Sequence, residues 1–324
     1  MDKKINMKAS PSIVCLGGGI GSVQLVRGLR DYSDKLTVVV SMADDGGSGG
    51  RLRRLFSIPP PGDLINCLAA LSDAEPVLKQ LLTYRFEGNR WGRDDSLKGQ
   101  KLGNLILVAL TKMYGDFNQA LTEAERIFAC HGKILPASID NVSIWAKTVD
   151  GMRIVGEETI DRGKYNGRRQ LSEIHLQPED ARASKEVLSA IKQADMIIAG
   201  PGDLYTTVLP VLAVKEIARA IRQSKVTKVF VVNIANKPFE TPNYSVYDYI
   251  EAVTRHVGSF PFTSVVVNTN VKPRMPRGFR YHYVQSDIID AAKKIKLLKA
   301  DLVNAEFPLY HDSAKLAAAL MKLL

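Results

Sequence analysis

The chain has 324 residues, of which 45% are hydrophobic and 24% charged, and its formal net charge is +10. This composition is typical of a soluble globular protein with one large domain or two ordinary ones. It argues against a membrane-spanning protein, because no stretch approaches the roughly 20 consecutive apolar residues of a span.

The basic charge permits nucleic acid, an anionic membrane surface or a phosphorylated small molecule as partner. Nucleic-acid binding rests on this charge alone, since the chain has no recognisable reading motif and no interleaved aromatic residues. Residues 1–10 are polar and lack the apolar region of a signal peptide, and we expect a disordered tail there. The cysteines Cys15, Cys67 and Cys130 lie in apolar segments without metal-binding spacing. This indicates buried free thiols in a reducing compartment, the cytoplasm.

The first predicted strand, residues 13–16, runs through a glycine-rich turn into a helix with apolar residues at helical spacing up to Leu29. Such a unit opens many nucleotide-binding folds, because glycines let the backbone approach a phosphate at the helix N-terminus. The strict G-x-G-x-x-G pattern fails at Ser22 and the Walker lysine is absent, which disfavours a dinucleotide or ATP-hydrolysing site. The alternative is a close helix–strand contact that needs small residues. The candidate ligand-binding residues are Gly17, Gly18, Gly19 and Gly21.

The second predicted strand, residues 36–40, leads into two aspartates, a glycine-rich run and a basic, predicted helical segment from Arg51 to Leu55. One interpretation is a flexible surface loop. The other is a phosphate or metal–phosphate site, in which backbone amides cradle the anion, Arg51 neutralises it, and Asp44 or Asp45 holds a hard cation. The candidate residues of this loop are Asp44, Asp45, Gly46, Gly47, Ser48 and Arg51.

Two further helix starts carry polar side chains. Asp63 follows a proline-rich elbow and is placed to cap a helix over residues 64–71, in which Asn66 faces the same crevice. Asn104 opens an apolar helix over residues 105–113, where it either caps the helix or presents its amide to a ligand.

The middle of the chain departs from the α/β pattern. Asp150-Gly151, between extended runs over residues 142–149 and 152–160, predicts a hairpin with a type I′ turn. This antiparallel excursion covers about residues 140–170. The basic segment over residues 162–169 is a solvated loop or a lid over an anionic ligand.

A third strand–glycine–helix junction follows at residues 195–221, with a helix expected from Val208 to Ile221. Backbone amides and threonine hydroxyls suit an anion at a helix N-terminus, whereas a tight turn is the alternative. The candidate residues are Gly200, Gly202, Asp203, Leu204, Tyr205 and Thr206, with Asn233 near the end of the next strand.

The C-terminal part predicts a helix over residues 286–296, a short strand over residues 301–303 and a closing helix from Asp312. His311-Asp312 is interpreted as a helix cap and its neighbour, because no second cluster supports a metal site. Alternating strands and helices predict one α/β domain over residues 1–324, with a Rossmann-like, doubly wound and mainly parallel sheet. The carboxyl ends of parallel strands share one edge, so the glycine-rich loops should meet there.

Several motifs resemble those of the bacterial gluconeogenesis factor family, within the CofD-like superfamily that also contains the 2-phospho-L-lactate transferases. They are Gly-Gly-Gly-Ile-Gly, Ala-Asp-Asp-Gly-Gly-Ser-Gly-Gly-Arg-Leu-Arg, Pro-Pro-Gly-Asp-Leu-Ile-Asn-Cys-Leu, Leu-Gly-Asn-Leu, Lys-Ile-Leu-Pro-Ala-Ser and Gly-Pro-Gly-Asp-Leu-Tyr-Thr-Thr. The resemblance runs in order from about Ile13 to the helix that follows His311-Asp312. The sequence departs from the usual gluconeogenesis-factor pattern at Ile20, Gly49, Asp203 and residues 236–241.

The resemblance implies a Rossmann-like fold, a nucleotide-diphosphate ligand such as UDP-N-acetylglucosamine, and a homodimer. It implies a cytoplasmic role in carbon metabolism, cell-wall precursor supply and cell shape. The transferase relatives instead move a phospholactyl group from a GDP-linked donor to a deazaflavin alcohol with Mg²⁺. Two hypotheses follow: a UDP-sugar-binding regulator, or a transferase in which Asp45 and Asp63 hold Mg²⁺.

Overall fold

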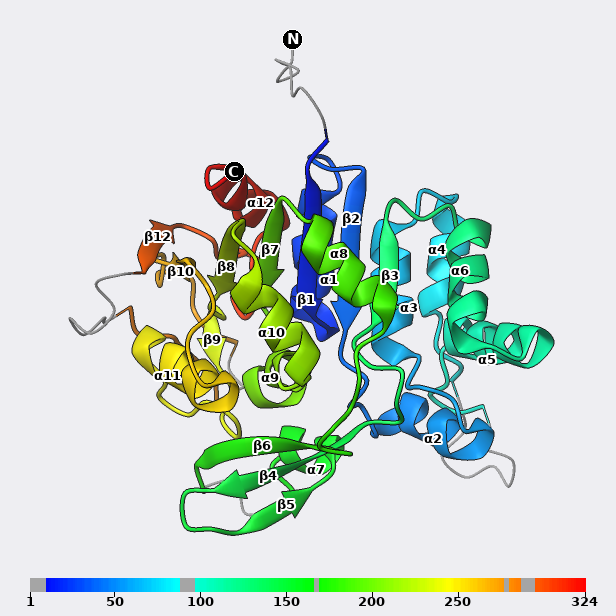
Figure 1. The fold of residues 1–324 in the computed structure, drawn as a ribbon, viewed down its shortest axis with the longest axis horizontal. Coiled ribbons are helices and arrows are strands. Elements are labelled where there is room, and N and C mark those ends of the chain that lie inside the picture. The colour runs from blue at the N-terminus through cyan, green and yellow to red at the C-terminus, as the bar shows by residue number, and fades with distance from the viewer. Residues whose placement is uncertain (1–9, 88–96, 166–168, 277–279, 287–294) are drawn as a thin grey trace.

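A seven-stranded, all-parallel sheet forms the centre of the molecule, in the order β12-β10-β8-β7-β1-β2-β3 (Figure 1). The strands are β1 (Ser12–Gly17), β2 (Lys35–Val40), β3 (Lys133–Pro136), β7 (Met196–Ala199), β8 (Thr227–Val231), β10 (Ser264–Asn268) and β12 (Lys296–Ala300). The strand order reverses between β1 and β7, and open α/β sheets bind ligands at such a switch point. This confirms the predicted Rossmann-like, doubly wound fold.

Helices cover both faces of the sheet, because the apolar strands must be buried on both sides. In β1, Ile13 and Cys15 face one hydrophobic cluster, whereas Val14 and Leu16 face the other. The first cluster packs against α1 (Gly19–Leu29), α3 (Gly62–Leu71), α5 (Leu102–Tyr114), α6 (Phe117–Ile127) and α12 (Ser313–Met321). The second packs against α8 (Lys185–Gln193), α9 (Leu209–Leu212), α10 (Lys215–Gln223) and α11 (Val246–Val257).

The expected antiparallel excursion is present as a small sheet in the order β5-β4-β6, which lies beyond the central sheet in Figure 1. Its strands are β4 (Ser143–Thr148), β5 (Arg153–Val155) and β6 (Leu171–Gln177). The predicted type I′ turn is wrong, because that turn needs positive φ at two central residues and here only Gly151, at 88°, has it. The amide of Gly151 donates to the carbonyl of Thr148 at 2.9 Å, which closes a longer loop.

Several element boundaries differ from the prediction. The expected helix over residues 208–221 is split into a π-turn, η1 (Leu204–Val208), and then α9 and α10. Pro210 lies in the first turn of α9, where its missing amide is tolerated, and the extended backbone of Val214, with a ψ of 108°, separates α9 from α10. The expected strand over residues 301–303 is displaced to β12, and Val303 makes only an isolated bridge with His311. The extended run predicted up to residue 160 ends at Val155, and α7 (Glu157–Asp161) follows.

The computed structural model describes residues 10–87, 97–165, 169–276, 280–286 and 295–324. The predicted tail and most of the predicted helix over residues 286–296 therefore lie outside the described residues, although Lys296 itself belongs to β12. Within the described part, no helix has the length and apolar character needed to cross a membrane. The remaining elements are α2 (Gly47–Phe56), α4 (Pro76–Thr83), β9 (Ala235–Asn236) and β11 (His282–Tyr283).

The edge strand β3 is protected against pairing with another strand. The backbone amide of Ile134 donates to the carboxylate of Glu125 at 2.6 Å, and Pro136 has no amide to offer. Because unpaired amides on an edge strand are a template for aggregation, these two features block the free side of the sheet.

Candidate functional site

Two adjoining cavities lie at the carboxyl edge of the sheet, beside the switch point between β1 and β7. The first chamber, of about 140 Å³, lies between the loops after β1 and β7 and the segment from Leu309 to His311. The second chamber, of about 530 Å³, is lined by the Gly46–Gly49 loop and the starts of α3, α5 and α7. The chambers share Gly19, Ile20, Asp203 and Thr207, so one elongated ligand can reach both.

Close contact between two loops explains some of the glycines at this edge. A Cβ atom on Gly21 would lie 2.5 Å from the carbonyl oxygen of Pro201. Gly200 has a φ of 73°, and a Cβ there would lie 2.7 Å from the carbonyl oxygen of Val231. At these two positions a close backbone contact requires glycine, which is the alternative explanation given above, and it does so whether or not a ligand binds.

Four helices begin at the second chamber without a side-chain cap. α1, α2, α3 and α5 start at Gly19, Gly47, Gly62 and Leu102, and none of their N-cap residues caps the helix through its side chain. α2 therefore begins inside the glycine run rather than at Arg51. Each helix start carries the positive end of a dipole, so the four together favour an anion, although the amides of Gly19 and Leu102 are already bonded to the carboxylate of Asp63 and the carbonyl of Tyr84.

The cations that line the second chamber are Arg85, Lys101 and Arg162, of which the sequence analysis considered only Arg162, the first residue of the basic segment over residues 162–169. Burial lowers the pKa of Lys101, and nearby Arg85 lowers it further. Arg51, the expected cation, instead donates to the carbonyl of Lys98 at 2.5 Å and does not line the chamber. Arg85, Lys101 and Arg162, rather than Arg51, are therefore the side chains placed to neutralise an anion in this chamber.

Three carboxyl groups of the second chamber have raised pKa values. Burial raises the pKa of Asp44 to about 6, with Asp63 adding to the rise and the amide of Gly46 opposing it. Burial also raises the pKa of Asp63, which the amide of Gly19 counteracts. Burial, with Asp44 next in importance, raises the pKa of Glu157 to about 10. A raised pKa favours the uncharged form of a carboxyl group, which weakens its repulsion of an anionic ligand.

Asp45 and Asp63 lie in different surroundings. The two carboxylate oxygens of Asp45 accept hydrogen bonds from the amides of Glu157 (3.1 Å) and Glu158 (2.9 Å), so Asp45 caps α7 and does not line either chamber. Asp63 was expected to cap its own helix, but that helix starts at Gly62, and Asp63 accepts from the amide of Gly19 at 2.8 Å. Asp44 and Asp63 are therefore the aspartates that face the second chamber together, and they are the better placed pair for a cation.

An internal carboxylate occupies the start of η1, where a phosphate was expected. Glu240, which is fully buried, accepts hydrogen bonds from the amides of Tyr205 (2.9 Å) and Thr206 (3.2 Å) and from the Thr206 hydroxyl (2.9 Å). Leu204 and Tyr205 are buried, and the Tyr205 hydroxyl pairs with that of Tyr244 at 2.8 Å. The η1 amides of residues 205 and 206 are thus already satisfied.

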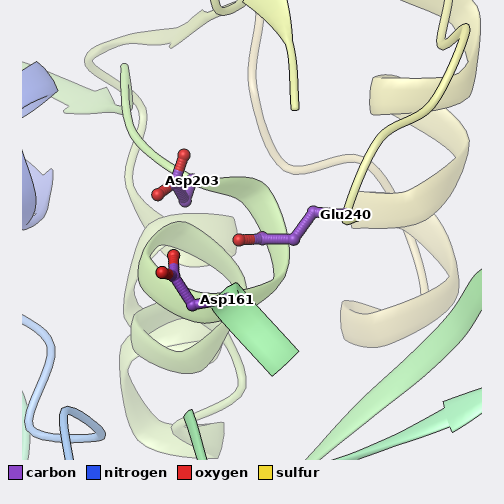
Figure 2. Close-up of side chains that lie close together, drawn as sticks. All are labelled: Asp161, Asp203 and Glu240. Carbon is purple, nitrogen blue, oxygen red and sulfur yellow. The ribbon is translucent and has the colours of Figure 1, made fainter. Parts of the chain in front are cut away.

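Asp161, Asp203 and Glu240 converge closely enough to suggest a metal site (Figure 2). However, the ammonium group of Lys237 pairs with all three, at 2.6 Å from Asp203 and 3.2 Å from Glu240. These carboxylates raise the pKa of Lys237 well above its usual value despite its burial. The donor set therefore does not fit a metal ion, because a cation of the chain already fills it.

Two buried side chains in the chamber walls have polar atoms without a hydrogen-bond partner among the described residues. Asn104 is 1% exposed, lines the second chamber, and leaves both its amide oxygen and nitrogen unpaired. His311 lines the first chamber and leaves Nε2 unpaired. By contrast, the side-chain amide of Asn233 is paired with the backbone of Gly202, at 3.0 and 2.8 Å. Buried polar groups without partners are rare in native proteins, so these two point to a missing ligand or water.

The structure brings most of the predicted site residues to the two chambers. Those that line a chamber are Gly18, Gly19, Gly21, Asp44, Gly46, Gly47, Ser48, Asp63, Asn66, Asn104, Gly202, Asp203, Thr206 and Asn233. Those that do not are Gly17, Asp45, Arg51, Gly200, Leu204 and Tyr205. The sequence analysis missed Arg85, Lys101, Glu157 and His311, which carry no local motif and reach the chambers only through the fold.

Comparison with known proteins agrees with this architecture. The family model described as 2-phospho-L-lactate transferase CofD matches residues 13–307. The gluconeogenesis factor of Bacillus subtilis is 36% identical over 325 residues, which cover 98% of this chain and 99% of that protein. A crystal structure of protein BH3568 from Bacillus halodurans superimposes with a TM-score of 0.87 at 33% identity, covering 96% of this chain and 99% of that one. The chain therefore belongs to the gluconeogenesis factor family of CofD-like proteins.

Proposed function

We propose that the protein binds a nucleoside diphosphate sugar, with UDP-N-acetylglucosamine as the first candidate, and acts as a regulator. The observation that supports this most is the convergence of four uncapped helix N-termini on one chamber that also contains Arg85 and Lys101. Oriented backbone amides and helix dipoles stabilise phosphate groups directly, so phosphate binding needs no particular side chain.

The two chambers differ in a way that suits the two ends of such a ligand. The first is small and has apolar and aromatic walls, among them Ile20, Leu309 and Tyr310, which suits a nucleoside. The second is larger and rich in carboxyl, amide and cationic groups, which suits the hydroxyls of a sugar. The diphosphate would lie at their shared boundary and extend into the second chamber, where the starts of α2, α3 and α5 and the side chains of Arg85 and Lys101 lie.

The physiological part of the proposal follows family membership. We infer a cytoplasmic regulator of carbon metabolism, cell-wall precursor supply and cell shape, working as a homodimer. Its three cysteines are free, which agrees with a reducing compartment. Light scattering on the purified protein tests the dimer directly.

Calorimetric titration with UDP-N-acetylglucosamine tests the binding, with and without Mg²⁺. We expect saturable binding in both conditions. Asn104→Ala should weaken it about tenfold or more, because removal of one hydrogen-bonding amide from a buried site costs about 1–2 kcal/mol. Asn118→Ala is the matched control, since Asn118 is exposed on α6 outside both chambers. Absence of binding, or equal effects of the two variants, would overturn the proposal.

A Mg²⁺-dependent transferase of the 2-phospho-L-lactate type is the second candidate. Asp44 and Asp63 face the second chamber together, and Mg²⁺ is commonly held by one or two carboxylates and by phosphate oxygens. In this case GDP, rather than a UDP-sugar, would bind tightly and only with Mg²⁺. Turnover with a deazaflavin alcohol as acceptor would establish this second function in place of the first.

A further inference from the structure

His311 is a buried histidine with one ring nitrogen in use and one without a partner. His311 is 3% exposed and lines the first chamber. One ring nitrogen bonds to the backbone carbonyl of Val232, whereas Nε2 has no partner in the described part of the chain. The bond to Val232 must therefore use Nδ1, which carries the hydrogen in the neutral ring.

The backbone around His311 is held firmly. His311 makes a bridge with Val303, and the next residue, Asp312, donates to the carbonyl of Leu302 at 2.8 Å and caps α12. The ring is therefore presented by a fixed backbone and oriented by Val232. A ring held in this way cannot easily turn Nε2 toward another partner.

His311 remains neutral at physiological pH. Burial lowers its pKa to about 3, although the bond to Val232 opposes this shift. In the neutral ring with its hydrogen on Nδ1, Nε2 is a hydrogen-bond acceptor. A buried acceptor without a donor is unfavourable, and a ligand that supplies the donor gains that free energy.

The other polar side chains of the first chamber are either already paired or are the hydroxyl groups of Thr207, Tyr281 and Tyr310, which can donate as well as accept. The amide of Asn233 is occupied by Gly202, and the carboxylate of Asp203 is paired with Lys237. The walls contributed by Ile20 and Leu309 are apolar side chains. A ligand in this chamber therefore meets apolar side chains, hydroxyl groups and, among the described residues, one buried ring nitrogen without a partner that can only accept.

We propose that His311 is a specificity-determining residue, whose Nε2 accepts a hydrogen bond from an N–H or O–H group of the bound nucleoside. This inference rests on the proposed binding of a nucleoside diphosphate. It predicts that the first chamber rejects a nucleoside that lacks or blocks this donor, because a site built around a hydrogen bond discriminates strongly against analogues without it.

Titration with UDP analogues tests the inference on the full-length protein. The probes are UDP, N3-methyl-UDP, 2′-deoxy-UDP and 3′-deoxy-UDP. We expect wild type to bind one analogue at least about tenfold more weakly than UDP. Loss with the N3-methyl compound identifies the base N–H as the donor, and loss with a deoxy compound identifies a ribose hydroxyl.

Variants connect this discrimination to His311. His311→Leu removes the acceptor and should bind UDP and the discriminated analogue equally. His311→Gln retains an acceptor and should preserve part of the discrimination. His282→Leu, at an exposed histidine of β11, should leave it unchanged. If His311→Leu fails to fold, the ¹⁵N resonance of His311 Nε2 in wild type should still shift on addition of UDP and shift less with the discriminated analogue.

The outcomes separate this inference from the proposed function. If wild type binds UDP but discriminates none of the analogues, or if His311→Leu keeps the full discrimination, the inference is wrong and the nucleotide binding stands. An Nε2 resonance that does not shift when bound UDP is present would likewise show that the inference is wrong, while the nucleotide binding stands. If wild type does not bind UDP, both the proposed function and the inference fall.

Discussion

The carboxylate of Asp63 accepts a hydrogen bond from the backbone amide of Gly19 at 2.8 Å, and thereby joins the first turn of α3 to the start of α1. This bond places a carboxyl group at one of the four helix starts around the second chamber. The carboxyl therefore supports the loop in the free protein and competes with an anion that approaches the same helix.

Two substitutions of Asp63 distinguish its support of the glycine-rich loop from its competition with a bound anion. Asp63→Asn keeps an acceptor for Gly19 and removes the charge, so the free energy of unfolding should change by less than about 1 kcal/mol. Affinity for UDP-N-acetylglucosamine should rise several-fold, since a like charge is removed. Asp63→Ala should lose about 1–2 kcal/mol of stability. Calorimetry and urea unfolding measure both quantities, and loss of binding in Asp63→Asn would point instead to a metal-holding role.

Ligand binding should strengthen as the pH falls toward 6. Burial raises the pKa of Asp44 to about 6 in the free protein, with smaller contributions from Asp63 and Asp45, while Arg53 opposes the rise. A bound diphosphate raises this pKa further, so binding takes up a proton. The affinity should then increase by up to about tenfold per pH unit as the pH falls through the interval above 6. UDP-N-acetylglucosamine is the appropriate probe, because its diphosphate does not titrate there. Asp44→Asn should remove most of this dependence, and a flat wild-type profile would contradict it.

Asp45 should matter for stability rather than for binding. Asp45→Ala removes the cap of α7 and should cost about 0.5–2 kcal/mol, whereas Asp45→Asn retains a capping side chain and should cost less. Both variants should bind UDP-N-acetylglucosamine within about threefold of wild type. Loss of Mg²⁺-dependent binding in both variants, with stability unchanged, would favour the transferase hypothesis.

Removal of the Lys237 ammonium should destabilise the protein strongly. Lys237→Met leaves the carboxylates of Asp161, Asp203 and Glu240 facing one another without a counter-charge, which should cost about 3–5 kcal/mol. The double variant Lys237→Met/Glu240→Gln should recover part of this loss, because one buried charge disappears. Urea unfolding of the single and double variants tests the coupling, and additive losses would contradict it.

Glu125 should make stability depend on pH. Burial raises its folded-state pKa to about 7, from an ordinary value of 4.5, while the amide of Ile134 and Lys133 oppose the rise. The folded state therefore holds this proton more tightly, and stability should fall as the pH rises from about 4.5 to 7. Glu125→Gln should remove this contribution and be about 1–2 kcal/mol more stable than wild type at pH 8, a figure discounted for partial exposure. Thermal unfolding at pH 5 and pH 8 measures the difference, which should be small at the lower pH.

The fold could be predicted because its signals are local. Apolar runs such as residues 36–40 and the glycines that follow them mark strands and the loops at their ends. The site could be predicted in outline for the same reason, since Gly19, Asp44 and Asn104 lie in such loops or helix starts. The internal contacts that occupy the amides of η1 could not be predicted, because Glu240 reaches the amide of Tyr205 from 35 residues away.

The errors have the same physical origin. Arg51 and Asp45 have the right chemistry and the right neighbours in sequence, but hydrogen bonds to Lys98 and to the start of α7 turn them away from the chambers. His311 shows the opposite case. Its sequence context indicates only a helix cap, and its unpaired Nε2 becomes apparent only when the chain end packs beside the first glycine-rich loop.

The four helix starts around the second chamber have an evolutionary consequence. In the proposed function, the attraction for phosphate comes from main-chain amides, which every amino acid except proline supplies equally. Substitutions in the chamber walls can therefore exchange one nucleotide or sugar for another while the affinity for the diphosphate is retained. A scaffold of this kind allows new ligand preferences to arise by drift at a few wall positions, without passing through a form that binds nothing.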